Sequence, residues 1–169
     1  MFSAIPKTIY ERIYILLQSL EVANGGYVKL LQRGFVPKNE NMLHPSQYPW
    51  IFIEDGGTTP PEPYRTFVFT YEYMVNIVAM TLADKGDMED MVYSHGFTNI
   101  NKGIGDIRAD LGALFWGYKK GGIGVAGVRD FTIGRTGNPN LGHVTPLLIN
   151  PFIRGIQMDL IFQCEEKLT

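Results

Sequence analysis

The segment from residue 64 to residue 83 reads YRTFVFTYEYMVNIVAMTLA and contains no glycine or proline. Because β-branched and aromatic residues at period two favour a strand over a helix, it predicts one long strand. About sixteen residues in a strand would span roughly 50 Å, which is long for a domain of this size. The strand is expected either to bend at a bulge or to reach past its own core to a neighbouring subunit, and the second option points toward an assembly protein. The face expected to be apolar carries Phe67, Phe69, Tyr71, Tyr73, Val75, Ile77 and Ala79.

The composition fits one domain, residues 1–169, with few charges. The chain is long enough for a sizeable core. Charged residues make up 19% of it, below the usual quarter, while 45% are hydrophobic and 12% aromatic. Two interpretations stay open: a large core under a neutral Gly, Asn and Thr surface, or a surface largely buried against partners. With a net charge of −2 and no basic stretch, no grip on nucleic acid is expected.

The sequence also bears on the cellular compartment. Cys164 is the one cysteine, which excludes an internal disulfide framework. The first residues carry Glu11 and lack the apolar core and small-residue cleavage site of a signal peptide. No apolar run reaches the length of about 18 residues that a membrane helix needs. A soluble protein, synthesised and assembled in the cytoplasm without a membrane segment, is therefore expected.

Two segments have the spacing of amphipathic helices. The first, Thr8–Ala23, opens with Thr8 and Glu11 at capping-box spacing and is followed by the stop signal Asn24-Gly25-Gly26. The second, Asn99–Gly117, contains internal glycines that cost about 1 kcal/mol each against alanine, so it needs packing to form. The apolar stripes are Ile9, Ile13, Leu16, Leu17 and Leu20 in the first, and Ile100, Ile104, Ile107, Leu111, Leu114 and Phe115 in the second.

The remaining segments predict strands and long loops. Tyr48–Glu54 is apolar on both faces and predicts a central strand buried on two sides. Further strands are expected at Tyr27–Gln32, Val128–Arg135 and Phe152–Glu165, with long loops at about 34–46, 55–63, 84–97 and 136–151. The predicted fold is therefore α+β, a mainly antiparallel sheet with two amphipathic helices packed on one face.

No motif predicts catalysis, a cofactor or a metal. Gly122–Gly127 matches GxGxxG, but a helix precedes it where the dinucleotide fingerprint needs a strand, so a flexible connector is expected. The acidic run 84–90 has Gly and Met where a calcium loop needs ligands. The histidines stand far apart, without the spacing of a metal site: His44, His95 and His143.

A hydrolase site is also not predicted. Ser94 and His95, with Asp90 nearby, are adjacent residues that rarely point at each other, and the nucleophile pattern GxSxG is absent. Cys164 lies on the apolar face of the last predicted strand and is interpreted as a small core residue. The sequence therefore predicts a protein that is not an enzyme, although a site assembled across the fold would leave little trace.

Five apolar residues are candidates for contacts between subunits. Three of them lie off the apolar stripe of the first predicted helix, where single exposed apolar residues are also common. Ordinary exposure and a contact surface therefore both stay open. The candidates are Tyr10, Tyr14, Ile15, Phe35 and Trp116.

The order and pattern of these elements resemble the tail terminator, or neck, proteins of tailed bacteriophages. The resemblance covers about half of the chain and rests on no diagnostic motif. The segments that carry it are Ile5–Leu20, Tyr48–Glu54, Arg65–Thr81, Asn99–Phe115 and Ile153–Glu165.

The resemblance implies a virion protein that forms a ring, commonly of six copies, at the end of the tail tube. Such a ring stops tube growth and joins the tail tube subunits to the head connector or neck proteins. DNA would pass through its lumen without specific binding, in keeping with the absence of a basic stretch. The alternatives are another virion subunit (head-completion, tail-tube or baseplate) or a small soluble enzyme with a site spread over the loops.

Overall fold

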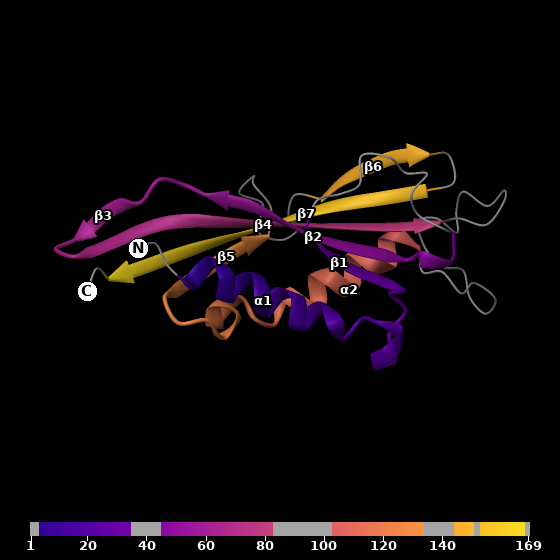
Figure 1. Cartoon of the computed structure of the whole chain (residues 1–169), viewed down its shortest axis with the longest axis horizontal. Coiled ribbons are helices and arrows are strands. Elements are labelled where there is room, and N and C mark those ends of the chain that lie inside the picture. Colours follow the sequence, from indigo (N-terminus) through magenta and orange to yellow (C-terminus); the bar gives the residue numbers. More distant parts are fainter. Residues whose placement is uncertain (1–3, 35–44, 83–102, 134–143, 151–152, 168–169) are drawn as a thin grey trace.

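The computed structural model describes residues 4–34, 45–82, 103–133, 144–150 and 153–167. Within these residues the chain forms two α-helices, three short 3₁₀ helices and seven strands (Figure 1). The helices are α1 (Ala4–Gln18), η1 (Val22–Asn24), η3 (Pro45–Gln47), α2 (Ile104–Trp116) and η4 (Lys119–Gly124). The strands are β1 (Leu30–Arg33), β2 (Trp50–Thr58), β3 (Glu62–Arg65), β4 (Val68–Leu82), β5 (Val128–Ile133), β6 (Val144–Asn150) and β7 (Ile153–Lys167).

The strands form one sheet built around the β4–β7 pair. The order is β1-β2-β4-β7-β5, with β3 paired to β4 and β6 to β7. β4 and β7 have 15 residues each and pair without a register shift, from Val68 opposite Lys167 to Leu82 opposite Ile153. Of the pairs in the described sheet, β1–β2 is parallel and the others are antiparallel. The predicted α+β fold with a mainly antiparallel sheet is confirmed.

Both α-helices cover the same face of the sheet, as predicted (Figure 1). The inward-facing positions of β4 alternate as the sequence predicts, and burying each large apolar side chain stabilises the fold by roughly 1.5–3 kcal/mol. The buried residues of this core include Ile9, Ile13, Leu16 and Leu17 of α1, Ile107, Leu111 and Phe115 of α2, and Tyr71, Tyr73, Val75, Ile77 and Ala79 of β4.

The opposite face of the sheet carries a second, smaller apolar cluster. It joins Tyr48, Trp50, Phe52, Val78 and Met80, which are all buried. Because Ile51 and Ile53 of β2 face the helix-side core, β2 is buried on both faces. The prediction of a central strand at this position is confirmed.

The bounds of the helices differ from the predicted ones. α1 begins at Ala4 and ends at Gln18, so Thr8 lies inside the helix, where its hydroxyl donates a hydrogen bond to the Ala4 carbonyl over 2.7 Å. The predicted capping box is therefore wrong. Gly25, at φ 82°, ends η1 rather than α1. α2 begins at Ile104, and residues 99–102 lie outside the described residues.

Two predicted loops contain strands. The loop at 55–63 is wrong because β2 continues to Thr58 through an irregularity in which the Asp55 carboxylate accepts a hydrogen bond from the Gly57 amide over 2.8 Å. That local bond keeps the Gly-Gly step in the strand. The loop at 136–151 is wrong in part, because residues 144–150 form β6 along β7. Residues 35–44, 84–97, 136–143 and 151 of the predicted loops lie outside the described residues.

The prediction of a single long strand from residue 64 is also wrong for the first residues of this segment. Two polar residues in succession, Arg65 and Thr66, interrupt the alternation, and Phe67 takes a positive φ of 62°. The chain turns back there, so that β3 pairs with β4.

Gly122–Gly127 connects α2 to β5, the position expected of a connector. Gly122 and Gly127 take φ values of 52° and 85°, which glycine adopts readily. Ile123 between them is fully buried, so this connector is anchored in the core. Among the described helices none is long and apolar enough to cross a membrane.

Candidate assembly surface at the projecting end of the sheet

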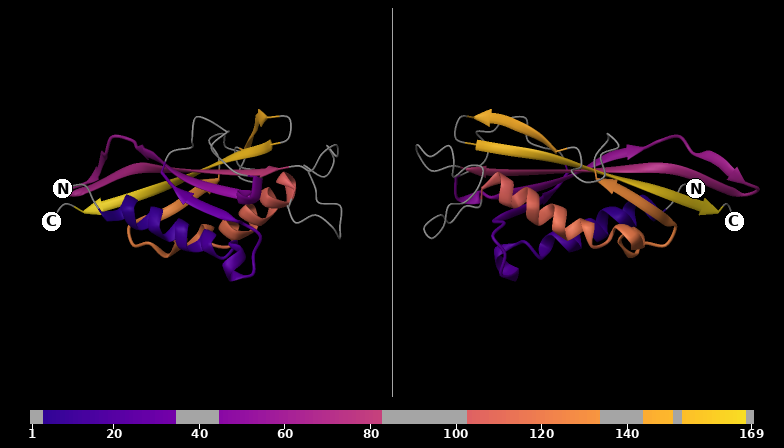
Figure 2. Two further views of the ribbon diagram at one scale, coloured as in Figure 1. Left: turned by 45° about the vertical axis from the view of Figure 1, so that its right-hand side comes forward. Right: turned by 180° about the vertical axis from the view of Figure 1, so that it is seen from behind.

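One end of the sheet extends past the helices. There β3, the turn at residues 66–67, the start of β4 and the end of β7 continue beyond the N-terminus of α1 (Figure 1 and Figure 2). We call this region the projecting end. All four residues of β3 are exposed. Because no described helix covers β3, its exposed side chains are not needed for packing of the core and can contact other molecules.

The turn at the tip of the projecting end exposes a large aromatic side chain. Phe67 is 69% exposed and has a φ of 62°. In the left-handed region the Cβ of an L-residue crowds the backbone, which costs roughly 1–2 kcal/mol. Phe67 therefore combines backbone strain with an apolar ring in water, two costs that its own fold does not explain.

Behind the tip, Tyr64 is held between two arginines. The Arg65 guanidinium carbon lies 4.9 Å from the centre of the Tyr64 ring, and that of Arg129 lies 4.6 Å from it. Tyr64 comes from β3 and Arg129 from β5, on opposite sides of the β4–β7 pair. The two side chains thus meet above this pair and tie the outer strands together. Tyr64 itself stays 47% exposed.

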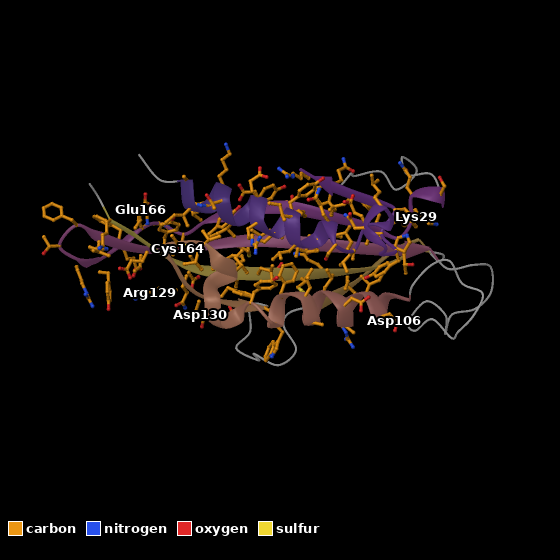
Figure 3. All side chains as sticks on the ribbon, turned by 90° about the horizontal axis from the view of Figure 1, so that it is seen from below. Lys29, Asp106, Arg129, Asp130, Cys164 and Glu166 are labelled. Carbon is orange, nitrogen blue, oxygen red and sulfur yellow. The ribbon has the colours of Figure 1, made fainter. Side chains whose placement is uncertain are left out.

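Charges at the projecting end are closely interleaved. Arg129 forms an ion pair with Glu165 of β7 at 2.5 Å. Arg129, and then Arg65, lower the pKa of the Tyr64 hydroxyl, while contact with Tyr64 raises the pKa of Arg129. Figure 3 labels Arg129 and Glu166 toward this end of the molecule. The two arginines therefore act directly on the Tyr64 hydroxyl, with the carboxylates of Glu62, Glu72 and Glu165 close by.

A pocket of about 460 Å³ opens beside Tyr64. Thr70 and Glu72 line it, and they alternate along β4 with the core residues Tyr71 and Tyr73, so the pocket opens on the face away from the helices. Its lining residues are Thr59, Pro60, Glu62, Tyr64, Thr70, Tyr71, Glu72, Arg129, Gln163 and Cys164.

The pocket has the chemistry of a binding surface. Its one thiol, Cys164, is 1% exposed, and burial raises the pKa of this thiol to about 12, so it is held in the unreactive protonated form. Its carboxylates and Arg129 can hold charged and polar groups. Among the described residues no group of three or more His, Cys, Asp or Glu side chains is arranged to hold a metal ion.

The structure separates the five contact candidates taken from the sequence. Tyr10 donates a hydrogen bond to the Ile53 carbonyl over 2.9 Å, and the Tyr14 ring lies 3.7 Å from the Arg33 guanidinium carbon. Both rings are partly buried against the core. Ile15 and Trp116 are 53% and 49% exposed, on α1 and α2. Phe35 lies outside the described residues, as do Asp90, Ser94, His95 and the histidines at 44 and 143.

Sequence reasoning missed the residues that form the projecting end. Phe67 was assigned to the apolar face of a continuous strand, and Tyr64 to its start. The signal that marks the turn is the consecutive polar pair Arg65-Thr66, which breaks an otherwise regular alternation. Arg129 has no sequence signal, because its contact with Tyr64 arises from the strand order.

No protein-family model matches this chain, and no curated protein matches it. Its function is therefore inferred from the geometry and chemistry of the projecting end.

Proposed function

We propose that this chain is a structural virion subunit of the tail-terminator kind. Six copies of it assemble into a ring on the end of the tail tube. The ring stops tube growth and offers a surface to the head connector. The observation that carries the proposal is the projecting end, a ribbon of paired strands that leaves the core and exposes Tyr64 and Phe67 at its tip.

The residue types at the projecting end support an assembly role. Tyrosine, phenylalanine and arginine are enriched at protein interfaces, and truncating such anchors often costs more than 1 kcal/mol of binding. Phe67, Tyr64 and Arg65 stand within four residues of each other on one hairpin. The low charge content of the chain, 19%, agrees with burial of surface between subunits.

The chemistry of the pocket beside Tyr64 also supports a role without catalysis. Burial raises the pKa of the Cys164 thiol to about 12, so this thiol is a poor nucleophile. The net charge of −2 suits a lumen through which DNA slides without being held, because tight binding by counterion release needs clustered Lys and Arg.

The experiment measures the molar mass of the purified chain by light scattering and its symmetry by negative-stain imaging. The same protein is then added to polymerising tail tube subunits. A closed ring that caps the tubes at a fixed length is the expected result. Rings that stack into tubes would instead assign a tube subunit. A compact monomer at high concentration, with the tube subunits present, contradicts the proposal.

A further inference from the structure

A hollow lies between the helices, where the segment that follows α1 faces the C-terminal half of α2. It is a shallow, wide-open depression with a volume of about 630 Å³. Leu20, Tyr27, Ala113 and Leu114 give it apolar walls, and Asp110 of α2 adds a carboxylate. We call it the helix-end hollow. Lys29 and Asp106, close in sequence to its walls, lie at the end of the molecule away from Arg129 and Glu166 (Figure 3).

Two glycines form the remaining wall of the helix-end hollow. Gly25 takes a φ of 82° and has open space where a Cβ would stand. At Gly26 a Cβ would lie 2.1 Å from the Leu20 carbonyl oxygen, so this position admits no side chain. The chain therefore makes a tight turn after α1 with bare backbone, which leaves room beside Leu20 and Leu114.

The helix-end hollow and the projecting end each offer a side chain of opposite charge: Asp110 lines the hollow, and Arg65 lies beside the turn at Phe67. Burial, and then the carboxylates of Asp110 and Asp106, raise the pKa of the Tyr27 hydroxyl, which places both carboxylates near this wall of the hollow. At the projecting end the two arginines lower the pKa of Tyr64. One surface thus presents aromatic rings with Arg65, and the other presents apolar walls with Asp110.

We infer that the projecting end of one copy docks into the helix-end hollow of the next copy, with Phe67 against the apolar walls and Arg65 facing Asp110. The inference rests on the proposed ring and names the two surfaces that form it. Burial of Phe67 in a neighbour accounts for an aromatic ring kept at a strained, exposed turn, since such strain is retained where function requires it.

The placement of the two surfaces suits a closed ring. They are two different and separate surfaces, so the contact is head-to-tail, and head-to-tail contacts close into a ring when the rotation per subunit allows it. A two-fold dimer would instead need both projecting ends to enter the partner's hollow at the same time, and light scattering distinguishes it from a ring by mass.

The first test reverses one charge on each surface. Arg65→Asp and Asp110→Arg are each expected to weaken self-association at least about tenfold, because like charges then face each other. An equimolar mixture of the two variants is expected to recover assembly, since every contact between unlike copies again joins opposite charges. Light scattering measures the mass, and circular dichroism checks that each variant is folded.

The second test uses a cross-link. The double variant Phe67→Cys with Ala113→Cys is expected to give a ladder of covalent multimers under mild oxidation, because both replaced positions are exposed and would face each other across the contact. The matched control is Phe67→Cys with Lys7→Cys, which adds an exposed thiol on α1 away from the hollow. Cys164 is buried in both proteins.

The outcomes separate the inference from the proposed function. If the Arg65→Asp variant still forms the ring that the wild-type chain forms, the inference is overturned. The same holds if the mixture of the two variants fails to reassemble. In both cases the proposed ring itself is not contradicted. A ring that persists in Arg65→Asp but no longer binds tail tube subunits means that the projecting end docks on another protein, which also overturns the inference. A wild-type chain that stays monomeric with tube subunits present overturns both.

Discussion

β4 runs through two regions of the molecule that differ in side-chain burial. Between Tyr73 and Ala79 every second side chain is buried under the helices. At the other end of the strand, β3 and the turn that follows it are exposed throughout, and Phe67 in this turn has a positive φ. The same backbone pairing continues through both regions, because β7 accompanies β4 along its whole length. The comparison teaches that strand pairing needs no covering layer, so a ribbon can leave the core and keep its shape.

The largest expected effect contrasts aromatic residues in the two regions. Phe162 is fully buried, with its ring centre 5.2 Å from that of Phe131 and 6.5 Å from that of Tyr73. Phe162→Ala is expected to lower the free energy of unfolding by about 3–5 kcal/mol. Phe67→Ala is expected to change it by less than about 0.5 kcal/mol, because the ring is in water. Urea unfolding measures both. Equal losses would mean that the projecting end is part of the core.

The second prediction concerns alkaline pH and the buried thiol. Burial raises the pKa of Cys164 to about 12, whereas an unfolded thiol ionises near 8.5. The folded chain therefore keeps a proton that the unfolded chain releases, so its stability is complete below about pH 8.5 and is lost as pH rises toward 12. The slope approaches about 1.4 kcal/mol per pH unit for this group.

Urea unfolding between pH 8 and 10 checks this slope. Cys164→Ala is the control, since it removes the titrating group and should flatten the curve of stability against pH over this range.

Burial also raises the pKa of Tyr73, so a second decline in stability is expected above pH 10 in both proteins. Tyr64 at the projecting end has its pKa moved down by Arg129 and should be among the first tyrosines to ionise. An unchanged slope in Cys164→Ala counts against the burial argument.

These differences explain which parts of the structure could be read from the sequence. In the two helices and the buried half of β4, the apolar residues repeat at fixed periods because their side chains pack into one core. Helix ends are set by local hydrogen bonds such as that from Thr8 to Ala4, which periodicity does not encode. The turn at Phe67 lacks glycine and proline, the residues that normally mark turns. The Tyr64–Arg129 contact depends on strand order, which one sequence does not specify.

The third prediction tests the strain at the tip of the projecting end. Phe67→Gly is expected to make the chain about 1 kcal/mol more stable than Phe67→Ala, because glycine adopts a positive φ without crowding by a Cβ. This reverses the usual order of the two residues in regular structure. Thermal or urea unfolding of the dissociated chain measures the difference. A less stable glycine variant would show that the turn is unstrained in solution.

The fourth prediction compares two similar clusters, one in each region. Arg33 pairs with Glu11 at 2.7 Å and lies over Tyr14, just as Arg129 pairs with Glu165 and lies over Tyr64. Both ion pairs are partly exposed, so each coupling energy should be below about 1 kcal/mol and should fall with added salt.

Double-mutant cycles with alanine at each arginine and its glutamate measure the two couplings. The tyrosines should differ more than the ion pairs, because Tyr14 packs against the core and Tyr64 does not. Tyr14→Ala is therefore expected to cost more stability than Tyr64→Ala. A larger loss from Tyr64→Ala would contradict the distinction between the two regions.

The smallest expected effect is on DNA, where we predict no measurable duplex binding at physiological salt. The arginines of the projecting end stand among carboxylates: Glu62 and Glu72 line the pocket, and Glu165 pairs with Arg129. Over the chain fifteen basic residues face seventeen acidic ones, so six copies at −2 each carry −12. Non-specific binding draws on several phosphate contacts at once and weakens steeply with salt. Fluorescence anisotropy with labelled duplex between 50 and 200 mM salt checks this.

The adjacent basic pair Lys119-Lys120 supplies the control. A salt-sensitive micromolar affinity that disappears in the double variant Lys119→Ala with Lys120→Ala would assign a DNA-contacting neck role. An affinity lost instead in Arg65→Asp would place DNA at the projecting end and exclude that end from docking on a second copy.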